Sequence, residues 1–476
     1  MMKNLRQKTA LTPPRLTLLR GFAAACAMAA SLAAPPAMAQ TTIDLTLDEA
    51  RTVATRALFS GQPALALQIA RTILAQSPDD RAALLVVAAA TPQLGDPTAG
   101  RQAGARAWTL SQTPVEKYEA ARLTALAAAN EERFTLSTFW LRRALTVAPN
   151  DAERARTIQD ARAVSRRNPW STELSFSLVP SNNVNGGADD SDCTSIGSFG
   201  CTLSEDAVAL QGWRASLSFG TQYRLQESQV SRTQVGLQYQ LSRAWITEET
   251  TVPDEAFNAA SYGINISHDR ALKTGTISAR LSRGRSEYRD LDLSAGTTEP
   301  EYYDILRFGI DRQFPLSDRT ALSFSAGREW LEYSVSVIGK VDRAILSTGI
   351  GYQLNNRDRV SASLSFVDNE GENPNYTSQE QSISLSYAWA EPFGPVTLSV
   401  GGGFKWSDYP DYRIGFAVDS GRQDETVFAS MNIGFPQIAY AGFTPGLRID
   451  ASKTNSNVSR FDRTTVSVGL TIKSLF

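Results

Sequence analysis

The sequence has little of what an enzymatic or metal site requires. Of its 476 residues, one is histidine, His268, and three are cysteine. A metal site needs several imidazole, thiolate or carboxylate ligands, and a serine hydrolase needs a base beside its nucleophile. His268 precedes Asp269, but no Gly-x-Ser-x-Gly motif accompanies them, so we interpret His268 as a structural residue near a turn. We therefore expect no enzymatic activity, no cofactor and no metal ion.

The chain also lacks long apolar segments beyond its N-terminus and an excess of positive charge. The longest apolar run after the leader, Ala82–Ala90, is far shorter than the ~18 residues that a membrane helix needs. Without the five basic residues of the leader, 42 basic residues face 49 acidic ones, a net charge of about −7. That balance gives no basic surface for nucleic acid. If the protein crosses a membrane, we expect it to do so with β-strands.

The N-terminus reads as a secretory signal peptide, residues 1–39. The apolar run Gly21–Ala34 is followed by the small-x-small site Ala37-Met38-Ala39, so the mature chain is expected to begin at Gln40. Cys26 lies inside the apolar run, which leaves a lipoprotein signal as a less favoured alternative. The basic residues that precede the run are Lys3, Arg6, Lys8, Arg15 and Arg20.

Residues 40–167 read as a helical domain with an internal repeat. Pro78, Pro114 and Pro149 lie 36 and 35 residues apart, and the expected turn positions Gly61, Asp96 and Glu131 are each 35 apart. This period favours tetratricopeptide-like helix pairs, with an irregular helical bundle as the alternative. Stacked pairs form a concave groove suited to a peptide segment or a partner protein, although the client-binding residues are unknown.

Six arginines of this domain outnumber the acids near them. They favour an acidic client segment or form an ordinary solvated helix face, and the second reading is preferred. The six are Arg101, Arg106, Arg122, Arg133, Arg142 and Arg143.

Residues 168–476 alternate apolar and small polar residues in segments long enough to cross an outer membrane. In Val360–Phe366 the even positions are apolar and the odd positions are serine, and the segment around Ile383 repeats the pattern. A soluble sandwich would carry charges on its second face. Serine, threonine and glycine there are typical of a membrane barrel with lipid outside and a hydrated lumen inside.

Fourteen candidate strands can be counted, an even number as expected for a bacterial barrel. They begin near residues 171, 212, 230, 257, 272, 301, 320, 342, 359, 378, 395, 423, 440 and 460. With the helical domain in the periplasm, the connections sort by length. Short periplasmic ones are expected at 226–229, 269–271, 355–358 and 391–394. Long outer ones are expected at 181–206, 246–256, 289–300, 368–377 and 409–422.

Several loop and terminal residues carry separate expectations. Cys193 and Cys201 lie in the first outer loop, and two cysteines so close together in an oxidising compartment predict a disulfide. The terminal Phe476 after an alternating strand resembles the signal read by the barrel assembly machinery. The acids of the second outer loop are interpreted as solvated; they are Glu248, Glu249, Asp254 and Glu255.

Two motifs resemble the surface lipoprotein assembly modulator (Slam) family. The first joins Asn168-Pro169-Trp170 to Pro180-Ser181-Asn182-Asn183-Val184-Asn185, and the second is Gly442-Phe443-Thr444-Pro445-Gly446-Leu447-Arg448 with Ser456-Asn457. The resemblance implies transport of lipoproteins, or of soluble proteins in some members, across the outer membrane. The short helical domain and the cysteine-closed loop depart from the family pattern.

The sequence therefore predicts an α+β multidomain protein: tetratricopeptide-like helices (40–167) followed by a 14-stranded antiparallel barrel (168–476). The expected function is an outer-membrane translocator that delivers lipoproteins or secreted proteins to the cell surface. Its expected partners are the client, a periplasmic chaperone, the barrel assembly machinery and outer-membrane lipid, with no nucleic acid. The alternative is a channel for polysaccharide or small solutes, which a strongly charged or aromatic lumen would favour.

Overall fold

The computed structural model describes residues 45–193, 201–292 and 297–474. The expected signal peptide, residues 1–39, and the terminal Phe476 lie outside the described residues. Seven α-helices come first among the residues described. They are α1 (Leu47–Phe59), α2 (Pro63–Gln76), α3 (Arg81–Ala90), α4 (Pro97–Leu110), α5 (Pro114–Asn130), α6 (Phe134–Thr146) and α7 (Asp151–Arg167).

Helix boundaries follow from local capping chemistry. Asp80 accepts a hydrogen bond from the Ala83 amide at the start of α3, and Asn150 caps α7 through the Glu153 amide. At α5, Thr113 and Glu116 form a reciprocal capping box around Pro114. Each cap satisfies a backbone amide that the first helical turn leaves without an intrahelical partner.

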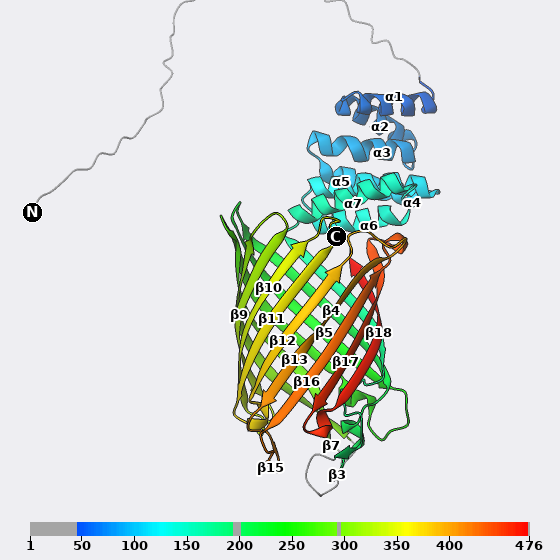
Figure 1. Cartoon of the computed structure of the whole chain (residues 1–476). Helices are drawn as coiled ribbons and strands as arrows, with labels where there is room; N and C mark the ends of the chain where they lie inside the picture. The colour runs from blue at the N-terminus through cyan, green and yellow to red at the C-terminus, as the bar shows by residue number, and fades with distance from the viewer. Residues whose placement is uncertain (1–44, 194–200, 293–296, 475–476) are drawn as a thin grey trace, which may run out of the picture. The chain divides into compact units, whose positions relative to one another are not determined.

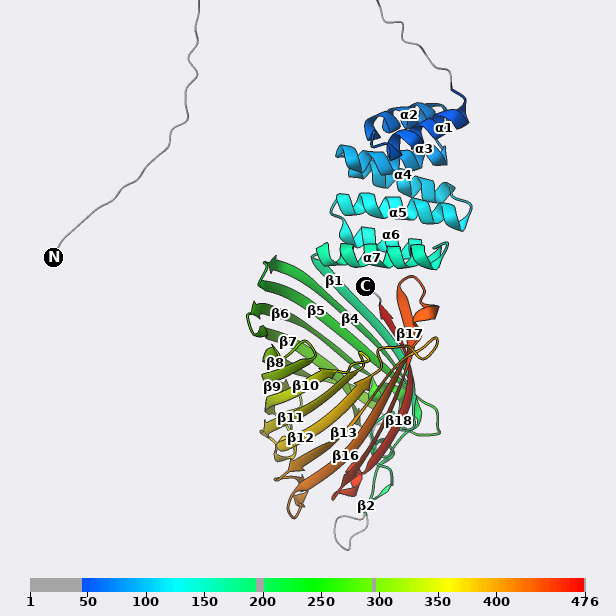
Figure 2. The ribbon, with the colours of Figure 1, turned by 45° about the horizontal axis from the view of Figure 1, so that its top comes forward.

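The helices stack in sequence order, each against the next, as Figure 2 shows. The turn positions read from the sequence separate α1 from α2, α3 from α4, and α5 from α6, with α7 after the last pair. The structure thus contains the expected helix pairs, whereas their tetratricopeptide-like nature stays a prediction. Small residues dominate the contacts, because Ala54, Ala66 and Ala70 are completely buried and let the helix axes approach closely.

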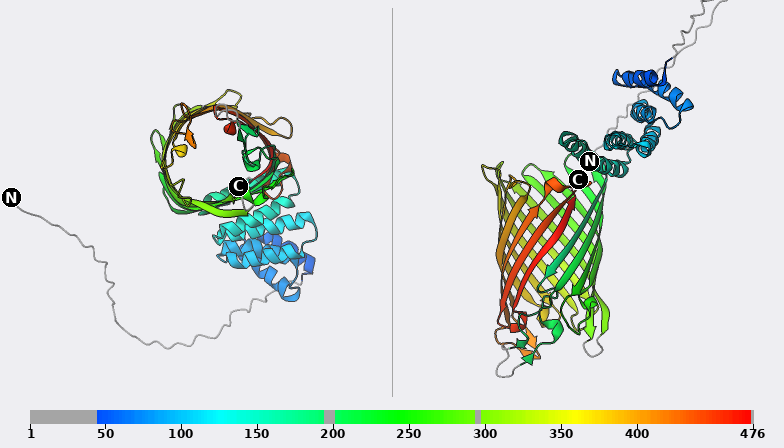
Figure 3. Two further views of the ribbon diagram at one scale, coloured as in Figure 1. Left: turned by 90° about the horizontal axis from the view of Figure 1, so that it is seen from below. Right: turned by 90° about the vertical axis from the view of Figure 1, so that its right-hand side faces the viewer.

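Fourteen antiparallel strands form one closed barrel (Figures 1 and 3), which confirms the predicted count. The order is β1-β18-β17-β16-β13-β12-β11-β10-β9-β8-β7-β6-β5-β4, and β4 also pairs with β1. The strands are β1 (Trp170–Ser181), β4 (Gly212–Glu227), β5 (Ser231–Ile246), β6 (Ala259–Leu272), β7 (Gly275–Asp292), β8 (Thr297–Pro315), β9 (Thr320–Tyr333), β10 (Lys340–Gln353), β11 (Arg359–Gly371), β12 (Ser378–Ala388), β13 (Thr397–Tyr409), β16 (Arg422–Gly434), β17 (Phe443–Ser456) and β18 (Arg463–Ser474).

The two faces of the barrel wall have the predicted chemistry. Ser361 lies opposite Ser386, and Ser363 lies opposite Ser384, with hydroxyl oxygens 2.6 and 2.7 Å apart. Leu364 and Leu385, on the other face of the same strands, are exposed. An exposed apolar face needs lipid around it, and a serine face can be hydrated, so the serines line the lumen.

Connections at the two ends of the barrel differ, as expected, but one periplasmic turn and two outer loops were assigned wrongly. Strand β6 continues to Leu272, so the expected turn 269–271 is paired strand and the hairpin turns at 273–274. Strand β7 continues to Asp292 and β8 begins at Thr297, so the expected loop 289–300 is mostly paired strand. Likewise β11 continues to Gly371, inside the expected loop 368–377. These hairpins keep pairing beyond the apolar band, because charged residues at strand ends do not interrupt a backbone ladder.

Short elements occur in the connections. Two small hairpins are formed by β2 (Asp192–Cys193) with β3 (Cys201–Thr202) and by β14 (Arg413–Ile414) with β15 (Phe416–Ala417). Single 3₁₀ turns are η1 (Thr91–Leu94), η2 (Glu205–Ala207), η3 (Asp254–Phe257), η4 (Pro374–Tyr376), η5 (Pro436–Ile438) and η6 (Ser459–Phe461).

Candidate functional site

The helical domain contains a groove of about 970 Å³. Most of its lining comes from α1, α3, α5 and α7, which are the first helices of successive pairs together with the last helix. Apolar side chains open onto it: Phe59 is 86% exposed and Leu126 is 54% exposed. Exposed apolar side chains in a concave surface are typical of a site that binds a partner.

Charged residues line the rest of the groove. Arg81 pairs with Glu119 at 2.9 Å, and Arg122 pairs with Asp160 across α5 and α7. Four arginines and two acids contribute to the lining, so the groove carries a small positive excess. The four arginines are Arg81, Arg122, Arg156 and Arg167.

A hydroxyl network fixes the distance between α5 and α7 at the groove floor. Tyr118 is buried, and its hydroxyl donates to the Glu153 carboxylate at 2.7 Å and lies 2.9 Å from the Thr157 hydroxyl. The hydrogen bond from Tyr118 lowers the pKa of Glu153, with further lowering by the charge of Arg122. Glu153 therefore stays ionised near neutral pH, and its hydrogen bond from Tyr118 joins α7 to α5.

The six arginines singled out in the sequence do not form one surface. Only Arg122 lines the groove. Arg101 pairs with Glu131 at 2.5 Å and Arg106 with Asp79 at 2.6 Å. Both arginines therefore form ion pairs that connect neighbouring helices. The other three have other partners: Arg133 lies 3.8 Å from Glu131, Arg142 donates to the Ala441 carbonyl at 3.0 Å, and Arg143 lies over the Trp108 ring.

The barrel lumen carries a polar ladder that the sequence patterns did not reveal. Glu329, only 5% exposed, accepts hydrogen bonds from Arg307 and from Arg343, the second at 3.3 Å. Arg343 also donates to Asn369 at 2.7 Å, and Asn369 donates to Ser378 at 2.9 Å. These residues join β8 to β12 through lumen-facing side chains.

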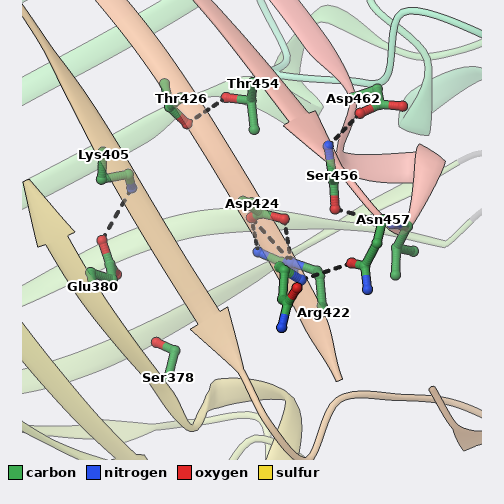
Figure 4. A network of polar contacts seen from close by, with 12 residues as sticks. Ser378, Glu380, Lys405, Arg422, Asp424, Thr426, Thr454, Ser456, Asn457 and Asp462 are labelled. Carbon is green, nitrogen blue, oxygen red and sulfur yellow. Dashed lines mark hydrogen bonds and ion pairs between the residues drawn. The ribbon is translucent and has the colours of Figure 1, made fainter. Parts of the chain in front are cut away.

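Figure 4 shows where the ladder continues. Lys405 of β13 pairs with Glu380 of β12 at 3.1 Å, and Thr426 of β16 lies 2.8 Å from Thr454 of β17. The sequence offers one indication of this ladder, which is the place of each residue along its strand. Each of these residues falls on the same alternating face as the serines of its strand, nearer the outer end.

A second cluster in Figure 4 surrounds Arg422 at the outer end of β16. Its guanidinium donates to Asp424 at 2.8 Å and lies over the rings of Tyr409 and Phe461, 3.8 and 3.6 Å from their centroids. An arginine enclosed by aromatic rings and a carboxylate is held rigidly. The cluster therefore fixes the loop 410–421 onto the barrel rim.

Tyrosines line part of the outer lumen, where the sequence pattern indicates mainly serine and threonine. Tyr288, Tyr303, Tyr333 and Tyr376 follow one another with centroid separations of 6.5, 5.0 and 5.9 Å. They lie in the outer parts of β7, β8 and β9 and in η4, where the alternating pattern is weak, so sequence reasoning missed them.

The residues considered for catalysis are used structurally. His268 shares a hydrogen bond with the Thr233 hydroxyl at 2.8 Å, and Asp269, on the opposite face of β6, pairs with Arg232. Glu248 accepts from the Gln211 amide. In the described residues no group of three or more metal-ligating side chains comes together.

The cysteine pair is placed by backbone only. Strands β2 and β3 set Cys193 directly opposite Cys201. Their side chains lie outside what is described, so the disulfide stays a prediction.

Comparison with known proteins gives several structural relatives. The "TodX deltaS2S3 mutant monoaromatic hydrocarbon channel" is 12% identical, with 65% of this chain and 91% of that chain covered and a TM-score of 0.34. Acinetobacter baumannii OccAB3 is 11% identical, with 64% and 98% covered and a TM-score of 0.33. A BenF-like porin from Pseudomonas fluorescens is 9% identical, with 64% and 98% covered and a TM-score of 0.34. No curated protein sequence matches the chain significantly.

The fold defines the class of protein. A closed barrel of 14 antiparallel strands with an apolar outer face and a polar lumen is an outer-membrane β-barrel. Among the described helices, none has the length and hydrophobicity to span a bilayer.

The family follows from the sequence of the barrel. Residues 170–476 match the sequence model of the surface lipoprotein assembly modifier family, and the chain belongs to this family. The resemblance noted in its motifs is thereby confirmed. Family and fold point to a non-enzymatic role in surface lipoprotein assembly at the outer membrane.

Proposed function

We propose that the protein is a translocator that receives a lipoprotein client in the periplasm and delivers it to the cell surface. The observation that carries the proposal is the combination of a client-sized apolar groove with an outer-membrane barrel of this family. The groove supplies a binding surface, the barrel supplies the route or insertion surface, and both belong to one chain.

The groove chemistry suits an extended client segment with apolar and acidic residues. Phe59, Leu85 and Leu126 offer apolar contacts, and the arginine excess offers charge complementarity. Apolar contacts supply most of the affinity of such a surface, and charges favour the encounter with an acidic segment.

A matched pair of substitutions on α5 tests the groove. Leu126 lines the groove and is 54% exposed, whereas Val115 is 51% exposed and lies outside the lining. The probes are the lipoproteins encoded beside this gene, expressed with it in a host that lacks both. Surface exposure is measured by protease shaving of intact cells.

We expect Leu126→Asp to reduce client exposure about tenfold, because it places a charge in an apolar contact worth about 1.4 kcal/mol or more. Val115→Asp should leave exposure unchanged, since an acid in the first turn suits a helix N-terminus. Equal exposure with and without the unsubstituted protein would reject the translocator.

The tyrosine row favours a second candidate function, passage of sugars. Neighbouring rings such as Tyr303 and Tyr333, tilted at 38° to each other, offer the flat faces on which sugar rings pack. The discriminating measurement is swelling of liposomes containing the purified protein in maltooligosaccharide solution. Rapid swelling that Tyr303→Ala slows, without any effect of the protein on lipoprotein exposure, would favour the channel.

A further inference from the structure

The barrel closes at a seam, β1 against β18, that is paired far less than any neighbouring junction. Among the residues that the structure describes, three pairs join them: Ser177 with Thr471, Leu178 with Leu470, and Ser181 with Ser467. Each strand pairs with its other neighbour at twelve positions. Figure 2 shows β1 and β18 in the barrel wall.

A proline weakens this seam near its outer end. The Asn182 amide donates to the Val466 carbonyl, and the Pro169 carbonyl accepts from the Arg224 amide of the β4 side. Backbone groups alternate along a strand, so even-numbered residues of β1 face β18 and odd-numbered ones face β4. Pro180 therefore faces β18 and has no N–H to give to its partner there.

At the outer end of the seam, side-chain bonds supplement two separate backbone bonds, from Asn182 to Val466 and from Asp189 to Asp462, in place of a regular ladder. Asn182 accepts a hydrogen bond from the Val466 amide at 2.7 Å and donates to the Thr464 carbonyl at 3.2 Å. Asp189 accepts from the Thr464 amide at 2.6 Å. Such bonds can open without unzipping a continuous backbone ladder.

The two sides of the seam differ in chemistry. On the lumen side stand small residues such as Ser177, Gly469 and Thr471, and the outer side presents Leu174, Phe176 and Leu470, all exposed. An opening here would connect the polar lumen directly with the apolar membrane phase.

We infer that the β1–β18 seam is the lateral exit through which the acyl anchor of a lipoprotein client passes from the lumen into the outer membrane. The inference rests on the proposed function and adds the route. Acyl chains are strongly unfavourable in a hydrated, serine-lined lumen, and the cost grows with every methylene group. The anchor therefore leaves through the wall, and the seam is the junction that breaks fewest hydrogen bonds.

A reversible cross-link tests the exit. Ser177 and Thr471 form a pair whose backbone groups point away from each other, and this geometry brings the β-carbons close enough for a disulfide. The variant is Ser177→Cys with Thr471→Cys, made with Cys193→Ser and Cys201→Ser. The matched control, Ser363→Cys with Ser384→Cys, bridges β11 and β12, where the hydroxyls are 2.7 Å apart.

With the seam bridged, exposure of the acylated client should fall at least tenfold and recover on addition of a membrane-permeant reductant. The control bridge should have no effect. A client whose acylated cysteine is replaced by serine should reach the surface despite the bridged seam. Undiminished exposure of the acylated client, or equal loss of both client forms, would overturn the assignment of the exit to the anchor.

Hydrogen exchange tests the seam separately from any client. In the purified full-length protein, the amides of Leu174, Phe176 and Leu178 face β18, and those of Glu173 and Ser175 face β4. We expect the first group to exchange at least tenfold faster. Equal protection would refute an opening seam, whereas failure of the unbridged protein to expose any client would refute only the proposed function.

Discussion

Replacement of Gly104 by alanine tests whether close helix packing, rather than helix propensity, decides the stability of the helical domain. A β-carbon at Gly104 would stand 2.4 Å from the Thr124 hydroxyl oxygen and 3.2 Å from the Thr124 α-carbon. Rotation of the threonine relieves the first contact but not the second, so α4 and α5 must move apart. Overpacking of this kind costs about 1–3 kcal/mol.

Propensity acts in the opposite direction. Alanine is favoured over glycine in a helix interior by about 1 kcal/mol, so the net expectation for Gly104→Ala is a loss of about 0–2 kcal/mol. Urea unfolding of the detergent-solubilised full-length protein, followed by circular dichroism at 222 nm, reports on the helices. Rotating Thr124 away also breaks the hydrogen bond of its hydroxyl to the Ala120 carbonyl. Thr124→Ala removes this part of the cost and leaves the α-carbon contact, so in the double variant the packing cost should shrink by about 1 kcal/mol. A stabilised Gly104→Ala protein, or strictly additive effects, would refute the packing argument.

Three further predictions concern charges and the cysteine pair. The hydrogen bond from Arg101 lowers the pKa of Glu131, so its stabilisation is present above the unfolded pKa and disappears as the pH falls through the lowered value. Glu131→Gln should therefore unfold more easily than the parent protein at neutral pH, and the difference should shrink as the pH is lowered below the unfolded pKa. Glu329→Ala removes the carboxylate that Arg307 and Arg343 share, at a cost of about 1–2 kcal/mol because both arginines remain partly exposed to solvent. The substitution should lower the temperature at which the barrel loses its fast electrophoretic migration; an unchanged temperature would contradict this. Alkylation of unreduced mature protein should label neither Cys193 nor Cys201, and labelling of both would exclude the disulfide.

The barrel was largely predictable from its sequence because the two faces of each strand meet two uniform environments, lipid and water. Alternation of residues such as Leu364 and Ser363 records lipid on one side and water on the other, and observed strand starts lie within four residues of those expected. At the strand ends both faces meet water, so the pattern no longer separates strand from loop. For that reason the hairpin ending at Asp292 was taken for a loop.

The helical groove and the lumen ladder were less predictable for a different reason. The repeat spacing located the helix pairs, but which helix face meets the groove depends on how successive pairs stack. Arg101 and Arg122 look alike in the sequence, yet one joins neighbouring helices and the other lines the groove. Similarly, Glu329 and Asn369 become neighbours of Arg343 only through strand register, which no single segment encodes.

The lumen ladder has a mechanical consequence. Side-chain bonds through Glu329, Arg343, Asn369 and Glu380 tie successive strands from β8 to β13 across the lumen face, adding bonds to the backbone ladder. Bonds of this kind oppose the sliding of neighbouring strands past one another. This arc of the barrel should therefore keep its strand register when bilayer thickness or lateral pressure changes.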